Sequence, residues 1–177
     1  MPTTIAPPEA GEFGEFHKGY LAAVANEPDA IAVLARQQPI IEAFRRLSTE
    51  QAGHRYAEGK WSLREIIGHL SDSERVFSYR LLRLGRADET PLPGFDENAF
   101  AARSNADSRG LGDLVDELAA VRVSTLALAR SLDDAAMTNR GLVNNWPLSA
   151  RAVAFIIAGH FQHHLNVLRE RYGMDLG

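Results

Sequence analysis

The chain has 177 residues, of which 45% are hydrophobic and 24% charged, and its formal net charge is −4 at pH 7. This length suits one domain with a sizeable core, and the dispersion of lysine and arginine among acidic residues argues against nucleic-acid binding. Because the sequence has no cysteine, disulfides, iron–sulfur clusters, thiolate metal sites and cysteine nucleophiles are excluded, and any metal site must use His, Asp, Glu or water.

The N-terminal segment, residues 1–12, is rich in Pro, Thr and Gly, and we expect it to form a flexible arm. Residues 13–177 are expected to form a single domain. The N-terminus shows no basic segment followed by an apolar run, and no apolar run in the sequence is long enough to span a bilayer. We therefore expect a cytoplasmic protein that has no membrane partner.

Helical periodicity begins at Asp29 and continues to about Leu47, with a kink or break expected at Pro39. A second helix is predicted to start at Ser62, because Ser62 and Glu65 have the spacing of a capping box. Its apolar residues recur at helical spacing until the turn residues that begin at Gly85.

A third helix is predicted from about Leu111 to Leu132, and a fourth from near Ser149 to a C-cap at Gly173. Residues 95–110 have a mixed pattern, with Phe95 and Phe100 as expected anchors. No segment shows sustained strand-like alternation. Four amphipathic helices joined by loops predict an all-α fold, a four-helix bundle with antiparallel neighbours and no sheet of consequence.

Histidines 160, 163 and 164 lie within one and a half turns of the last predicted helix. On a helical wheel His160 and His164 flank or enter the apolar arc, whereas His163 points away from it. Two histidines spaced i, i+4 can reach one metal ion from a single helix. His69 lies at the edge of the apolar arc of its own helix and is the candidate third ligand.

The alternative interpretation is that His69, His160 and His164 are ordinary polar residues at the edge of an apolar face. His17 and His54 are expected on the surface or in loops.

The segments GKWSLREIIGHLSDSE (59–74), PLPGFDENAFA (91–101) and WPLSARAVAFIIAGHFQHHLNVLRERYG (146–173) resemble the DinB-like superfamily, in particular its YfiT-like branch of metal-dependent hydrolases. The resemblance implies an up-down four-helix bundle with a three-histidine site for one divalent metal ion, most often nickel or zinc. By motif, the implied ligands are His69, His160 and His164. Members of this family include thiol S-transferases, which implies a low-molecular-weight thiol as cosubstrate, and relatives often form dimers.

Several other residues are candidates for supporting roles. Trp61 and Trp146 are expected to pack where the metal-bearing helices begin, and Asp72 is a candidate to orient an imidazole by a hydrogen bond. The arginines at positions 80 and 122 fall near apolar faces. A buried arginine needs a carboxylate partner, for which Asp96 and Glu74 are candidates, and Asp96 is also a candidate for the mouth of the site.

Three neutral imidazoles leave a divalent ion with its full positive charge, which lowers the pKa of a metal-bound water or thiol. The expected protein is therefore a metal-dependent transferase or hydrolase that acts on a small-molecule substrate, with the metal-bound water or thiol as its catalytic group. A non-catalytic metal-binding protein, active in stress response or in interaction with a partner, is the alternative. The lack of an obvious general base beside the histidines favours that alternative.

Overall fold

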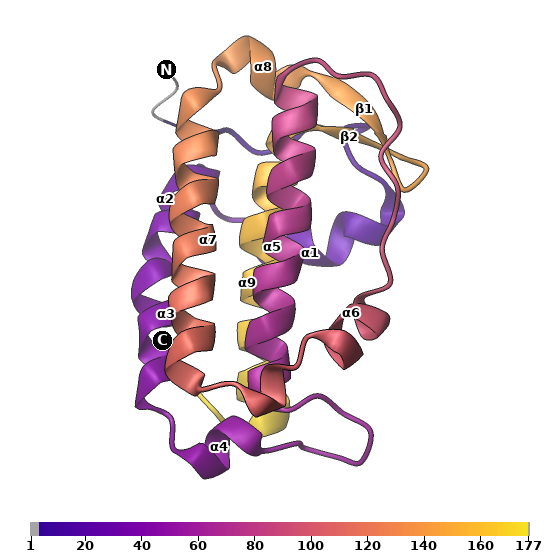
Figure 1. The fold of residues 1–177 in the computed structure, drawn as a ribbon. Helices are drawn as coiled ribbons and strands as arrows, with labels where there is room; N and C mark the ends of the chain where they lie inside the picture. Colours follow the sequence, from indigo (N-terminus) through magenta and orange to yellow (C-terminus); the bar gives the residue numbers. More distant parts are fainter. Residues whose placement is uncertain (1–3, 177) are drawn as a thin grey trace.

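The computed structural model describes residues 4–176, and its main feature is a bundle of four long helical segments (Figure 1). The bundle helices are α2 (Ala30–Arg36) continued by α3 (Gln38–Ala43), α5 (Leu63–Gly85), α7 (Leu111–Ser131) and α9 (Ala150–Tyr172). The remaining elements are short: η1 (Glu15–His17), α1 (Lys18–Ala22), η2 (Phe44–Arg46), α4 (Thr49–Gly53), α6 (Glu97–Arg103), η3 (Ala106–Ser108), α8 (Asp134–Thr138), β1 (Arg140–Val143) and β2 (Trp146–Ser149). The predicted four-helix bundle is confirmed.

The ends of the helices follow local chemistry. Ser62 and Glu65 form the expected capping box at the start of α5. The Ser149 side chain accepts a hydrogen bond from an amide in the first turn of α9, and Gly173 ends that helix in the left-handed conformation, at φ +65°. The break between α2 and α3 places Pro39 in the first turn of α3, where proline is tolerated because it lacks only a hydrogen bond that the helix does not make.

The direction of one neighbouring pair differs from the expected antiparallel order, because α5 and α7 run parallel (Figure 1). Ser62, at the start of α5, donates to Asp107 just before α7, and the far ends of the two helices meet where Gly85 packs against Leu132. The connection 86–110 makes this possible. Its 25 residues can run back along α5, which is roughly 35 Å long at 1.5 Å per residue.

A short antiparallel hairpin, β1–β2, precedes α9 and was not expected from the sequence. Asn144 and Asn145 form its turn, both at positive φ, as a two-residue type I′ turn requires. Two adjacent asparagines between the apolar pairs 142–143 and 146–147 were the signal in the sequence for this hairpin.

The N-terminal segment expected as a flexible arm is instead anchored on the bundle over its described part, residues 4–12. Ile5 is 2% exposed and its amide donates to Asp29 at 2.8 Å. Glu12 is 1% exposed and accepts hydrogen bonds from Arg151, at 2.6 and 2.7 Å. Burial of an isoleucine and pairing of a carboxylate together hold this segment in place.

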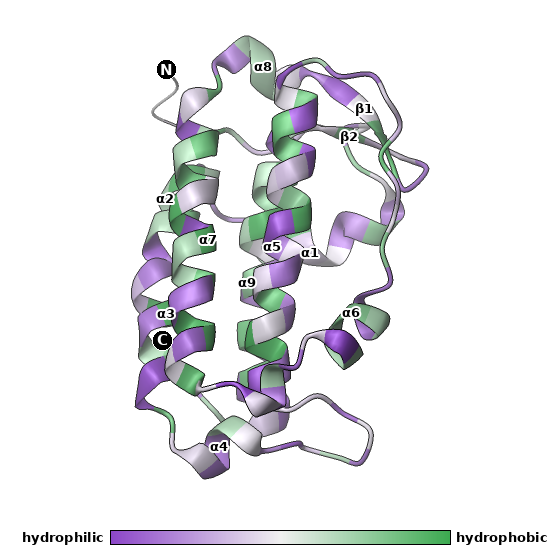
Figure 2. Cartoon of the chain, in the orientation of Figure 1, coloured by the Kyte–Doolittle hydropathy of each residue, from purple (hydrophilic) through white to green (hydrophobic). Residues whose placement is uncertain are grey.

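The core contains two apolar clusters, one toward each end of the bundle. Polar and apolar residues alternate along the long helices (Figure 2). A polar layer crosses the bundle between the clusters. In this layer Arg122, which is fully buried, donates from Nε and Nη2 to Glu74 at 2.8 Å each. Its Nη1 donates to Gln37 Oε1 at 2.9 Å, and Gln37 Nε2 donates to the Ala158 carbonyl oxygen at 2.9 Å. Glu74 is thus the partner expected for a buried arginine.

No helix within the described part of the chain is both long enough and apolar enough to cross a membrane.

Candidate metal centre

Three imidazoles converge between α5 and α9. The Nε2 atom of His69 lies 3.1 Å from Nε2 of His160 and 3.1 Å from Nε2 of His164. His69 and His160 are each 5% exposed, and His164 is partly buried. His163 is exposed, as the helical wheel predicted. The antiparallel packing of α5 on α9 therefore brings together the three histidines that the sequence singled out.

The distances from the His69 nitrogen to the other two nitrogens fit a single divalent ion, and all three lie within 4.8 Å of one another. With metal–nitrogen bonds of about 2.0–2.1 Å, two imidazole nitrogens lie about 2.9 Å apart at a right angle and about 3.3 Å apart at a tetrahedral angle. The observed 3.1 Å separations fall between these values. The donor set thus fits both tetrahedral and octahedral coordination, with the remaining positions open.

The charge state of the three imidazoles also suits metal binding. Burial, with a smaller contribution from nearby His163, lowers the pKa of His69 to about 4. Burial also lowers the pKa values of His160 and His164 well below the ordinary histidine value, and repulsion from neighbouring histidines adds to this. All three rings are therefore neutral at pH 7, which is the form of imidazole that binds a metal.

Ser73 supports His69 from one turn further along α5. Its buried hydroxyl lies 3.4 Å from Nδ1 and 3.5 Å from Nε2 of His69. The expectation that Asp72 orients an imidazole is wrong, since Asp72 lies 3.6 Å from Arg75 and makes no recorded contact with a histidine among the described residues. The i, i+4 spacing of His69 and Ser73 was the signal in the sequence for this hydroxyl.

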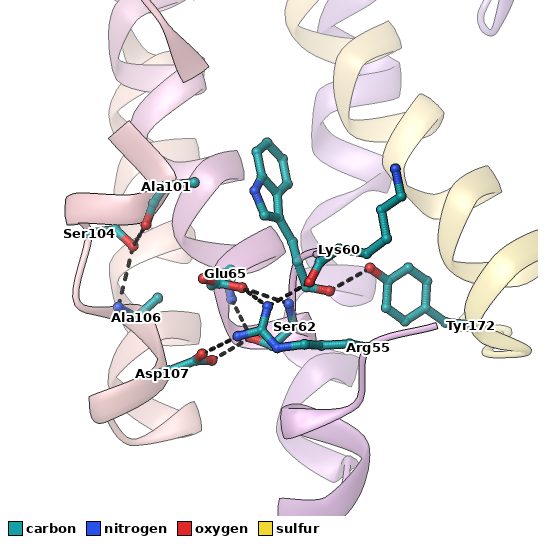
Figure 3. Close-up of polar contacts among 10 residues, drawn as sticks. Arg55, Lys60, Ser62, Glu65, Ala101, Ser104, Ala106, Asp107 and Tyr172 are labelled. Atoms are coloured by element: carbon teal, nitrogen blue, oxygen red, sulfur yellow. Dashed lines mark hydrogen bonds and ion pairs between the residues drawn. The ribbon is translucent and has the colours of Figure 1, made fainter. Parts of the chain in front are cut away.

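A network of polar contacts fixes the chain just before α5 (Figure 3). Arg55 donates to the Lys60 carbonyl oxygen at 2.6 Å and pairs with Glu65 and Asp107, each at 2.5 Å. Asp107 also accepts from the capping hydroxyl of Ser62. These contacts tie the start of α5, and hence His69 two turns later, to the segment that precedes α7.

Aromatic rings surround the three histidines. The Trp61 ring lies against that of His69, with ring centres 4.6 Å apart and the rings tilted by 43°. The Trp61 carbonyl oxygen accepts from the Tyr172 hydroxyl at 2.7 Å. Phe77 lies against His160, with ring centres 5.4 Å apart. The expected packing role of Trp61 is thus extended, because the ring covers one of the histidines itself.

A further ring reaches the site because α1 lies directly on α9. A Cβ atom on Gly159 would be 2.1 Å from the Tyr20 carbonyl oxygen, so this close approach requires glycine. The Tyr20 ring then lies 5.2 Å from that of His160. The same approach buries His17, which is 5% exposed, so its expected surface or loop position is wrong. His54 is exposed, as expected.

A pocket of about 370 Å³ opens beside the three histidines. Its wall includes Arg80 and the exposed carboxylate Glu97. Asp96, a candidate for this mouth and for pairing with an arginine, instead accepts from the amides of Asn98 and Ala99 and caps α6. The arrangement combines three convergent neutral nitrogen donors with space for a small molecule.

Comparison with known proteins identifies a family model, a solved structure and a curated relative that this chain resembles. The model of the DinB superfamily matches residues 33–168. YfiT from Bacillus subtilis, described as a probable metal-dependent hydrolase with an unusual four-helix bundle topology, has 18% sequence identity and a TM-score of 0.68, over 96% of this chain and 94% of that one. A protein of Oceanobacillus iheyensis, OB0413, named as a candidate metal-dependent hydrolase, is 31% identical over 67 residues.

The match to the Oceanobacillus protein spans 37% of this chain and 38% of that relative, well under half of either. The likeness to YfiT extends over nearly the whole of both chains and supports the fold. The family match includes at least part of each of the four bundle helices and contains the three convergent histidines. The chain therefore belongs to the DinB superfamily.

Proposed function

We propose that the protein is a metal-dependent enzyme that binds one divalent ion through the Nε2 atoms of His69, His160 and His164. The observation that carries this proposal is the position of the His69 Nε2 atom, 3.1 Å from Nε2 of both His160 and His164, beside a pocket of about 370 Å³. Three protein ligands leave coordination positions free, which is the arrangement of reactive sites and not of closed structural sites. An all-imidazole donor set suits zinc and nickel.

A divalent ion bound here supplies a positive charge that lowers the pKa of a coordinated water or thiol. The residues of this chain prepare the site for it. Burial keeps His69 neutral, and the Ser73 hydroxyl contacts its ring. Trp61, Phe77 and Tyr20 cover the histidines and limit the access of bulk water.

Hydrolysis of a small molecule is the reaction that the names of the two relatives favour. Transfer of a low-molecular-weight thiol is the second candidate. The observation that favours it is the composition of the pocket wall. Among the described residues that line the pocket, Glu97 is the one carboxylate, and it is exposed to water. A thiol that is activated by its own ionisation has less need of a protein base than a water molecule has.

Two variants within one short segment test the metal site. Protein purified without a histidine tag should contain up to one zinc or nickel ion per chain, and His164→Ala should lose it. His163→Ala is the matched control and should keep it, because His163 is exposed and lies outside the convergent set. Metal content is measured by elemental analysis.

The same variants should differ in stability. At a free metal concentration of one hundred times Kd, binding stabilises the fold by about 2.7 kcal/mol, which raises Tm by about 5–10 °C for a chain of this size. The wild type and His163→Ala should show this rise, and His164→Ala should not. Loss of metal from His163→Ala with retention in His164→Ala would show that the ligands are misassigned.

Activity is tested on metal-depleted protein that is then reloaded with zinc or nickel. Metal-dependent cleavage of p-nitrophenyl acetate supports hydrolysis, and metal-dependent transfer of glutathione or bacillithiol to 1-chloro-2,4-dinitrobenzene supports thiol transfer. If one ion binds and a broad panel of esters, amides and electrophiles shows no turnover, the enzyme proposal fails, and a non-catalytic metal-binding protein is the better description.

A further inference from the structure

Arg80 is a buried cation that has no carboxylate partner among the described residues. It is 6% exposed and lies on α5, in the wall of the pocket beside the three histidines. The acceptor recorded for it is the Pro93 carbonyl oxygen, 2.9 Å from Nη2. Arg122, the other buried arginine of the bundle, is neutralised by Glu74. A buried charge without a counter-ion is costly, so its presence at a pocket calls for an explanation.

Two aromatic rings hold the Arg80 guanidinium without neutralising it. Its Cζ atom lies 5.6 Å from the ring centre of Phe77 and 5.7 Å from that of Phe95. Such cation–π contacts and the hydrogen bond to Pro93 fix the plane of the guanidinium. Arginine has five N–H donors, and only Nη2 is engaged by an acceptor in the described chain. The remaining donors have no acceptor in the described chain, and the residue lines the pocket.

His17 provides a second, independent indication of a ligand. It lines the same pocket, is 5% exposed, and its Nδ1 atom is buried without a hydrogen-bond partner in the described part of the chain. Buried polar atoms in native proteins are normally satisfied by protein, water or ligand. The buried His17 ring therefore lies in the same pocket wall as the uncompensated Arg80.

The position of Arg80 relative to the histidines limits the size of the ligand. The Phe77 ring lies between them, with its centre 5.6 Å from Arg80 Cζ and 5.4 Å from the centre of the His160 ring. The guanidinium and the His160 ring are therefore at most about 11 Å apart, within the length of a small organic molecule. The exposed carboxylate of Glu97, also in the pocket wall, disfavours a second negative charge near the mouth.

We propose that Arg80, together with His17, forms a subsite for the carboxylate of a small monocarboxylic acid that occupies the pocket. Guanidinium and carboxylate form strong, charge-assisted hydrogen bonds, often in pairs. The placement of the reacting part of the same molecule against the three histidines rests on the proposed function. The subsite itself requires no metal, and its test is made without one.

The probes are phenylacetate and phenylacetamide, which have nearly the same shape and differ in charge. Their affinities for metal-depleted protein are measured by isothermal titration calorimetry. Phenylacetate should bind roughly tenfold more tightly than phenylacetamide, the usual order of a charge-assisted hydrogen bond. His164→Ala, which removes a metal ligand, should retain this preference.

Arg80→Gln should abolish the preference for phenylacetate, because glutamine keeps a donor for Pro93 but has no charge. Arg83→Gln is the matched control. It removes the same charge from the same helix, but Arg83 pairs with Asp88 and is not part of the pocket wall, so the preference should persist. If Arg80→Gln does not fold by circular dichroism, Arg80→Lys takes its place. It keeps the charge but not the planar fork, so its preference should be several-fold smaller than that of the wild type.

Equal affinity of the wild type for the two probes, or an unchanged preference in the folded Arg80 variant, would overturn the proposal. The two proposals fail separately. A charge preference that depends on Arg80 in a protein that binds no metal would support the subsite and refute the metal site. One bound ion without any charge preference would do the reverse.

Discussion

The buried ion pair between α5 and α7 allows a quantitative test of how the bundle is held together. Glu74→Gln keeps the shape of the side chain but removes the negative charge that faces Arg122. Both partners are almost fully buried, and the pair makes two hydrogen bonds of 2.8 Å. Loss of one partner leaves an uncompensated charge in the core, which typically costs 3–5 kcal/mol, or about 6–20 °C in Tm for a chain of this length.

The matched control is Glu117→Gln. Glu117 also joins α7 to α5, through Arg75 at 2.6 Å, and it pairs with Arg109 at 2.5 Å, but its side chain is 23% exposed. A bridge in contact with water is worth at most about 1 kcal/mol. Urea unfolding followed by far-UV circular dichroism gives both free energies. The large cost should appear only in Glu74→Gln, with an unchanged dependence on urea concentration.

Equal costs for Glu74→Gln and Glu117→Gln would refute this reasoning, since they would show that the Arg122 layer is hydrated or readily rearranged. A double variant gives a further check. Replacing Glu74 with leucine and Arg122 with methionine removes both charges, and it should regain part of the stability lost in the single variant, because Gln37 loses a buried donor.

Three further predictions concern the N-terminal anchor, the α1–α9 contact and the support of His69. Hydrogen bonds from Arg151 lower the pKa of Glu12 from 4.5 to about 2. Between these pH values the unfolded chain binds a proton that the folded chain does not, so the stability of the fold falls as the pH is lowered. The contribution lost is roughly 3 kcal/mol, and Glu12→Gln should lack it in urea titrations at pH 7 and pH 2. Gly159→Ala should lower Tm, although alanine favours a helix by about 1 kcal/mol, because the new Cβ meets the Tyr20 carbonyl oxygen. Ser73→Ala should weaken zinc binding roughly tenfold without changing the stoichiometry, because His69 loses an orienting hydroxyl.

Each of these predictions has a control. Gly112→Ala, where the nearest atom to a Cβ is an arginine nitrogen at 3.8 Å, should be neutral or stabilising, and equal behaviour of the two glycine variants would contradict the close-approach argument. A Glu12→Gln variant as acid-sensitive as the wild type would show that other carboxylates dominate. Unaltered zinc affinity in Ser73→Ala would remove the serine from the site.

Local sequence patterns were sufficient to predict the bundle helices and the two histidines that α9 contributes to the site. The Ser62–Glu65 capping box, Pro39 and Gly173 act within a turn or two of the chain, so their effects can be recognised without knowledge of the fold. The i, i+4 spacing of His160 and His164 likewise predicted that both rings point inward and that the intervening His163 does not.

Other features depend on contacts between residues distant in the chain, and no local pattern contains them. The parallel order of α5 and α7 follows from the course of residues 86–110, and the burial of His17 follows from the contact of α1 with Gly159. Similarly, the sequence indicated two arginines near apolar faces, but packing alone pairs Arg122 with Glu74 and leaves Arg80 without a carboxylate. Periodicity reports which side of a helix is apolar, whereas the neighbour that covers that side is set by how the whole chain packs.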